Sequence, residues 1–147
     1  MNKSRIILLA GLGVAIIAIG IGLSMYFKPH KTIAGAEPDF QLTVPELINA
    51  FSLDEAGATA KYVANDKVIL VTGVVRDIDM QGGGSVVIML GQEGTDGSVA
   101  CTLTAEESVK SGSVTKGSTI SITGQCTGMQ GLIEPEVIMI RCGLVPD

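Results

Sequence analysis

Residues 68–75 read Val-Ile-Leu-Val-Thr-Gly-Val-Val, a run of aliphatic and β-branched residues that is interrupted once, by Gly73. Such side chains favour strands. A glycine inside a long strand lets the backbone bend sharply, so that one strand can contribute to both sheets of a small barrel. We therefore expect a bent strand over residues 67–79.

Four further strands are expected on the C-terminal side, where β-branched runs alternate with glycine-rich turns. Their predicted ranges are 85–91, 98–103, 118–127 and 133–144. Between the second and third of these ranges, Thr104 and Glu107 form a capping box that starts a short helix. The resulting order, β-β-β-α-β-β, predicts an all-β fold with short helices: a five-stranded Greek-key barrel of the OB type.

The N-terminal region accounts for the high mean hydropathy of +0.46. Residues 6–27 form a run without charged residues, with basic residues on both sides: Lys3, Arg5, Lys28 and Lys31. A helix of this length extends about 33 Å, enough to cross the hydrocarbon core of a bilayer. We expect a single-pass transmembrane helix in a bacterial inner membrane. Residues 1–5 would form a cytoplasmic tail, and the C-terminal domain would lie in the periplasm.

A cleaved signal peptide is the alternative for this region. Ala34-Gly-Ala36 resembles a signal-peptidase site before Glu37. Two features argue against cleavage. The apolar run is longer than the usual ~7–15 residues of a signal peptide, and the basic segment 28–31 separates it from the candidate site. We expect the anchor to be retained, while cleavage after Ala36 stays open.

Residues 28–42 are polar and contain glycine and proline, which predicts a tether. Thr43 and Glu46 then form a capping box that begins a short amphipathic helical segment. Ser52 and Glu55 repeat this spacing, so two short helices or one kinked helix should precede the sheet. The folded domain is expected to comprise residues 43–147.

The chain offers few residues for catalysis. Its one histidine, His30, lies beside the predicted membrane segment, outside the domain. No Ser-His-Asp, Cys-His or paired-carboxylate set can be assembled from the sequence, and the three cysteines are too far apart for a zinc motif. We therefore expect a protein that is not an enzyme and that has no metal and no cofactor.

The cysteines can pair in an oxidising compartment such as the periplasm. In an OB barrel the third strand lies beside the fifth, which favours a disulfide between Cys101 and Cys142. Cys126 on the fourth strand could compete, and three buried free thiols are the other alternative.

Two glycine-rich loops are the candidate binding loops, because OB folds use the loops between strands 1 and 2 and between strands 4 and 5. Their residues are Gly82, Gly83 and Gly84 in the first, and Gly128, Met129, Gln130 and Gly131 in the second. Neither loop has the Lys-Ser/Thr and following helix of a phosphate-binding loop.

The charge of the domain argues against nucleic acid as a partner. From Gly35 onward there are six basic residues and fifteen acidic ones, a formal charge of −9. No aromatic residue follows Tyr62. OB folds that hold single strands combine a basic groove with stacking aromatic side chains, and the domain has too few of either. We therefore expect no nucleic acid to bind.

Residues 45–144 resemble the tRNA-anti-like family of OB-fold domains, which are small bacterial envelope proteins often carried behind a membrane anchor or a lipid-modified cysteine. The resemblance is carried by Ala60-Lys61-Tyr62, the strand 68–75, Val99-Ala-Cys101, Lys116-Gly117 followed by 120–128, and the closing run 137–142. This chain has no early cysteine for lipid attachment, so the apolar helix would replace the lipid.

These observations together predict a non-catalytic, membrane-anchored envelope protein. It would present an OB-fold binding module to a protein, a glycan or a small ligand outside the cytoplasmic membrane. The alternative is a nucleic-acid-binding OB domain.

Overall fold

The computed structural model describes residues 3–26, 33 and 35–146 of the chain. The chain divides into two units, Met1–Thr32 and Ile33–Asp147. The first contains one helix, α1 (Lys3–Tyr26). In the part of the chain that the structure describes, no helix combines the length and the apolar character needed to cross a membrane. The transmembrane helix predicted for residues 6–27 is therefore not found there, although α1 covers most of that range.

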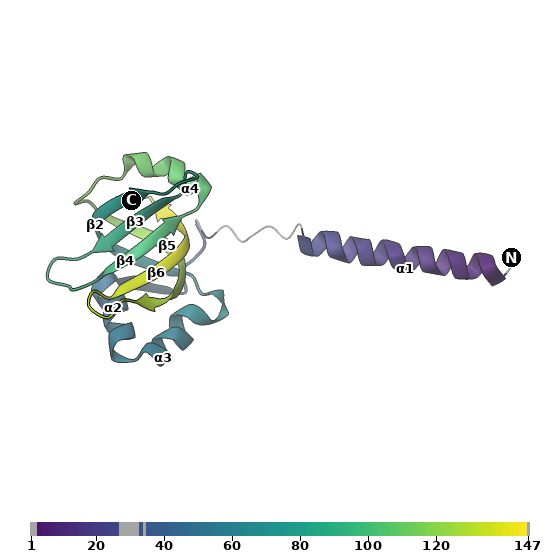
Figure 1. Ribbon diagram of the computed structural model, residues 1–147, viewed down its shortest axis with the longest axis horizontal. Helices are drawn as coiled ribbons and strands as arrows, with labels where there is room; N and C mark the ends of the chain where they lie inside the picture. Colours follow the sequence, from purple (N-terminus) through teal and green to yellow (C-terminus); the bar gives the residue numbers. More distant parts are fainter. Residues whose placement is uncertain (1–2, 27–32, 34, 147) are drawn as a thin grey trace. The chain divides into compact units, whose positions relative to one another are not determined.

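The second unit is a closed barrel of five strands with helices at its two ends (Figure 1). The barrel strands are β2 (Ile69–Met80), β3 (Val86–Gly91), β4 (Ser98–Leu103), β5 (Thr119–Gln130) and β6 (Glu136–Val145). The sheet order is β1-β2-β3-β4-β6-β5, and pairing of β2 with β5 closes the barrel. Helix α4 (Ala105–Lys110) lies between β4 and β5 in the chain. The predicted β-β-β-α-β-β order and the OB-type barrel are thus confirmed.

Strand β2 bends as its sequence predicts. Its first half pairs with β5 up to Val74, and its second half pairs with β3 from Val74 onward. Gly73, next to the point of exchange, leaves room for Val44 of the preceding helix: a Cβ at position 73 would lie 2.5 Å from Val44 Cγ2. The missing side chain therefore allows both the bend and the close approach of the helix.

Strand β1 (Phe40–Thr43) was not predicted, because residues 40–42 were assigned to the tether. It pairs in parallel with the start of β2, with Phe40 opposite Ile69. Asp39 positions it by accepting a hydrogen bond from the Val68 N–H at 2.9 Å. A four-residue strand held by partners far along the chain has no periodicity of its own to detect. Of the remaining predicted tether, residues 28–32 and 34 lie outside the described residues.

The helical segment begins with α2 (Val44–Leu53), which starts at the predicted capping box. Glu46 Oε2 accepts hydrogen bonds from both the N–H and the hydroxyl of Thr43, at 2.7 and 2.8 Å. The apolar residues of α2 share one buried face: Val44, Leu47, Ile48 and Phe51. The helix packs on β2, β3, β4, β5 and β6 and covers one end of the barrel, while α4 covers the other (Figure 1).

The second predicted cap is wrong by two residues. Helix α3 (Glu55–Ala58) is capped by Asp54, whose carboxylate accepts the Gly57 N–H at 3.0 Å. Ser52 belongs to α2 instead. A π-helical turn (Thr59–Val63) and a 3₁₀ turn (Ala64–Asp66) then lead into β2. The barrel core contains fully buried aliphatic side chains and one methionine: Ile69, Val71, Ile88, Leu90, Val99, Ile122, Val137 and Met139.

Candidate functional site

One outer face of the barrel is shared by β2, β3, β4 and β6. Residues paired across neighbouring strands lie on the same side of a sheet. The pairs Asp77–Met89, Met89–Ala100 and Ala100–Ile138 trace one row across this face, and their neighbours Ile88, Cys101 and Met139 are buried in the core. We define the sheet face by the residues on the outward side of its strands, of which Ala100 is itself buried by its neighbours: Asp77, Asp79, Val87, Met89, Ala100, Thr102, Glu136 and Ile138.

The sheet face is apolar along its centre and acidic at both edges. Asp77 and Asp79 are exposed on β2, and Glu136 is half-buried on β6. A hydrogen bond from Lys116, whose Nζ lies 2.5 Å from Asp77 Oδ1, holds the pKa of that carboxyl below its usual range. Asp77 therefore stays ionised at neutral pH.

The first predicted binding loop lies where expected. Gly82, Gly83 and Gly84 are exposed between β2 and β3. Gly83 and Gly84 have φ of +94° and +84°, a conformation that side chains rarely adopt. Glycine is therefore needed at these two positions for the turn itself.

The second predicted loop is shifted along the chain. Strand β5 continues to Gln130, so that Gly128, Met129 and Gln130 pair with β6 and only Gly131 lies in the turn. The loop between β5 and β6 is thus residues 131–135. A Cβ at position 131 would lie 2.3 Å from the Glu134 carbonyl oxygen, which explains the glycine.

Both loops carry exposed apolar side chains that the sequence analysis missed. Met80 at the end of β2 is 78% exposed, and Leu132 and Ile133 in the β5–β6 loop are 105% and 93% exposed. The available signal was an apolar Leu-Ile pair between Gly131 and Pro135, a place where turn residues are normally polar. Exposed large apolar residues beside a sheet of this kind are typical of interaction surfaces.

Arg76 fixes the loop between β3 and β4. Its guanidinium donates to the carbonyl oxygens of Gln92, Thr95 and Gly97, each at 3.0 Å. This loop and Ile133 line a cavity of about 460 Å³. Arg76 therefore holds the loop between β3 and β4 in a defined conformation.

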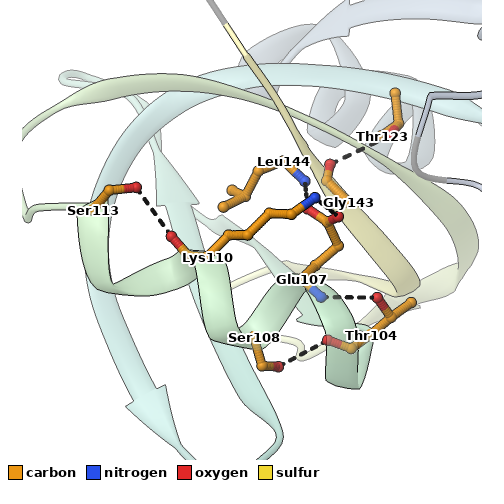
Figure 2. A network of polar contacts seen from close by, with 8 residues as sticks. All are labelled: Thr104, Glu107, Ser108, Lys110, Ser113, Thr123, Gly143 and Leu144. Atoms are coloured by element: carbon orange, nitrogen blue, oxygen red, sulfur yellow. Dashed lines mark hydrogen bonds and ion pairs between the residues drawn. The ribbon is translucent and has the colours of Figure 1, made fainter.

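A polar network connects α4 to the end of β6 (Figure 2). Glu107 is buried, and its carboxylate accepts the Leu144 N–H at 3.0 Å and the Lys110 ammonium at 2.7 Å. The hydrogen bond from Lys110 lowers the pKa of Glu107 below its usual range. Thr104 caps the helix by accepting the Glu107 N–H at 3.3 Å, but the predicted capping box is incomplete, because the Thr104 N–H donates to the Cys142 carbonyl oxygen at 3.1 Å and not to Glu107. These bonds hold the helix against the last strand.

The three cysteines come together in the barrel core as free, buried thiols. Leu103, two residues after Cys101, lies opposite Cys142 on the neighbouring strand. A side-chain hydrogen bond with Cys101 raises the pKa of Cys142, and burial raises the pKa of Cys126 to about 11. A disulfide between Cys101 and Cys142 stays a prediction. Within the described ranges, no group of three or more His, Cys, Asp or Glu residues is placed to hold a metal ion.

The tRNA_anti-like family model matches residues 1–142. A crystal structure described as a proposed nucleic-acid-binding lipoprotein from Klebsiella pneumoniae is 21% identical, with a TM-score of 0.60 over 73% of this chain and 92% of that chain. The Stn1–Ten1 complex of S. pombe matches at 17% identity and a TM-score of 0.39, over 54% of this chain and 59% of that chain. No curated protein matches in sequence.

These comparisons overturn the prediction that nucleic acid is excluded as a partner. The chain matches the tRNA_anti-like model, and a structural neighbour from Klebsiella pneumoniae is described as a proposed nucleic-acid-binding lipoprotein. Nucleic acid is therefore not excluded as a partner. The prediction rested on the scarcity of aromatic side chains and on the net charge of the domain. A net charge is a sum over the whole domain and does not reveal where cations gather on its surface.

Proposed function

Since this chain belongs to the tRNA_anti-like family of OB-fold domains, we propose that it is a non-catalytic binding module whose ligand site is the sheet face. OB folds bind their ligands on the strands that correspond here to β3 and β4, between the two loops that follow β2 and β5. The fold alone does not select the ligand. The chemistry of the face does.

The sheet face supports a protein partner. Its centre, with Val87, Met89 and Ile138, offers apolar contact, while Asp77 and Glu136 at the edges favour cations. A partner that presents aliphatic side chains flanked by lysine or arginine would match both properties.

The observation that carries this proposal is the exposure of Leu132 and Ile133 in the β5–β6 loop. Burying one such side chain contributes about 1.5–3 kcal/mol to the free energy of binding, so a partner that covers both neighbouring side chains is favoured. Contact with the apolar centre of the sheet face would add to it.

Site-specific photocrosslinking in living cells tests the proposal. A photoreactive amino acid at Ile133 or at Met89 should trap a protein partner. The matched control is Val109 on α4, which is 85% exposed but lies outside the sheet face. The double variant Leu132→Ser/Ile133→Ser should abolish crosslinking from Met89. Equal crosslinking from Val109, or none from either site, contradicts the proposal.

Nucleic acid is the second candidate ligand. It is favoured by the family match and by the description of the Klebsiella pneumoniae neighbour as nucleic-acid-binding. Direct titration with a labelled single strand tests this candidate.

An envelope location is a further part of the proposal. It is supported by the uncharged run over residues 6–27 and by the description of the Klebsiella pneumoniae neighbour as a lipoprotein. Membrane attachment through residues 6–27 rests on the sequence alone. Protease accessibility in spheroplasts would place the domain, since an envelope domain is digested before the cells are lysed.

A further inference from the structure

The six basic residues of the domain fall into two groups that differ in how tightly they are held. Three are fixed by short contacts. Lys110 lies 2.7 Å from the buried Glu107 carboxylate, and Lys116 lies 2.5 Å from Asp77. Arg76 donates three bonds to its loop. A ligand phosphate would have to displace these partners first.

The other three basic residues have weaker contacts. Lys67 Nζ lies 3.5 Å from Asp39, at the outer limit of a hydrogen bond. Arg141 Nη1 lies 3.4 Å from Gln125 Oε1. Lys61 Nζ stands over the Phe40 and Tyr62 rings, 5.4 and 5.0 Å from their centroids. These three cations are the ones that can turn towards an incoming anion.

These three residues form one surface, which we name the cationic surface: Lys61, Lys67 and Arg141. Gln125 links Arg141 to Lys67. Its Oε1 accepts a hydrogen bond from Arg141, and its Nε2 donates one to the carbonyl oxygen of Asp66, the residue before Lys67. Phe40 links Lys61 to Lys67, because its ring lies beneath the Lys61 ammonium and it directly follows Asp39, the partner of Lys67. The cationic surface shares no residue with the sheet face.

Two independent features mark the same place. Of the described non-glycine residues, three have positive φ, and all three lie here: Asn65 at 62°, Asp66 at 51° and Arg141 at 53°. Backbone conformations of this kind are costly, and they cluster at functional sites. In addition, Phe40 is the only one of the fully described aromatic side chains that is not buried. It supplies an aromatic group against which a base can pack.

We propose that the cationic surface, and not the sheet face, binds the phosphodiester backbone of a single-stranded nucleic acid. This inference rests on nucleic acid as the second candidate ligand above. The three cations lie beside the acidic residues Asp39 and Asp66. The sheet face presents three carboxylates, of which, among the described residues, only Asp77 is paired with a cation, Lys116. A phosphate chain is therefore attracted to the cationic surface and repelled by the sheet face.

Fluorescence anisotropy of the full chain with a labelled 15-nucleotide oligo(dT) tests the inference. Three neutralised phosphates on a single strand predict a slope of log affinity against log salt of about −2. The dissociation constant should then rise about 20-fold between 50 and 200 mM salt. The double variant Lys61→Gln/Arg141→Gln should leave a slope of about −0.7 and weaken binding about 25-fold at 100 mM salt.

The matched control is Lys110→Gln/Lys116→Gln, which removes the same charge from two exposed lysines outside the cationic surface and should leave the affinity unchanged within about 2-fold. Circular dichroism confirms that each variant is folded, and Lys67→Gln provides an independent single change on the cationic surface. If the control weakens binding more than Lys61→Gln/Arg141→Gln does, the inference is wrong although nucleic-acid binding stands. If the unaltered chain does not bind oligo(dT), the inference and nucleic acid as the second candidate ligand are both wrong. Binding through these residues only to vesicles with 30% phosphatidylglycerol also overturns the inference.

Discussion

The buried Glu107 carboxylate allows a sharp test of how the barrel is held together. Replacing Glu107 by alanine removes the acceptor of the Leu144 N–H at 3.0 Å and the partner of Lys110. A hydrogen bond to a charged group contributes about 1.5–3 kcal/mol. The ion pair adds only about 0.2–1 kcal/mol, because the Lys110 side chain is 66% exposed. We therefore expect Glu107→Ala to lower the free energy of unfolding by about 2–4 kcal/mol.

Two further variants separate the contributions. Glu107→Gln keeps an oxygen acceptor for Leu144 but loses the charge, so it should cost about 1 kcal/mol. Glu106→Ala removes a carboxylate one residue away that is exposed, and it should change stability by less than about 0.5 kcal/mol. Urea denaturation followed by circular dichroism at pH 7 measures all three values.

The pH dependence gives a second readout. The pKa of Glu107 is lower in the folded protein than in the unfolded chain, because Lys110 donates to it. The carboxylate therefore stabilises the fold fully above its ordinary pKa, and this stabilisation is lost as the pH falls through the lower folded value. The difference between the unaltered protein and Glu107→Gln should shrink between pH 5 and pH 3. A stability difference that does not change with pH, or equal stabilities of Glu107→Ala and Glu106→Ala, would show that Glu107 does not hold α4 against β6.

Three more outcomes are expected. Gly73→Ala should destabilise the domain by about 1–3 kcal/mol, because the added Cβ meets Val44 at 2.5 Å, whereas Gly112→Ala, with open space around it, should be neutral in the same urea titration. With a pKa of about 11, Cys126 should resist iodoacetamide at pH 8 in the folded protein and react once it is unfolded, and mass spectrometry that finds rapid labelling in the native state would contradict this. Membrane fractionation should recover the uncleaved chain with the membranes, and release of a protein that begins at Glu37 would show that residues 6–27 are not an anchor.

The strand pattern and two of the three helix starts could be predicted because the information is local. The bend at Gly73 and the capping box of Thr43 and Glu46 each depend on residues within a few positions of one another. The five barrel strands and the helix between β4 and β5 follow from the same kind of signal. Family membership was also recognisable, because its motifs lie within these elements.

Features that depend on distant partners were missed. Strand β1 exists because Phe40 pairs with Ile69, and the register of β5 with β6 decides that Gly128 lies in a strand and not in a loop. The cap at Asp54 was assigned to Ser52 because both residues fit the local pattern, and only the end of α2 decides between them.

The class of fold, the order of the strands and the total charge of the domain follow from the order of the amino acids alone. The positions of the charges on the surface follow only from how the chain folds. Lys61 and Arg141 are 80 positions apart in the chain, yet the π-helical turn Thr59–Val63 and β6 both contact β5, which brings the two residues to one surface. The net charge of a domain does not say where each charged residue lies on its surface. A phosphate interacts mainly with the nearest cations, because exposed charges are screened beyond about 10 Å.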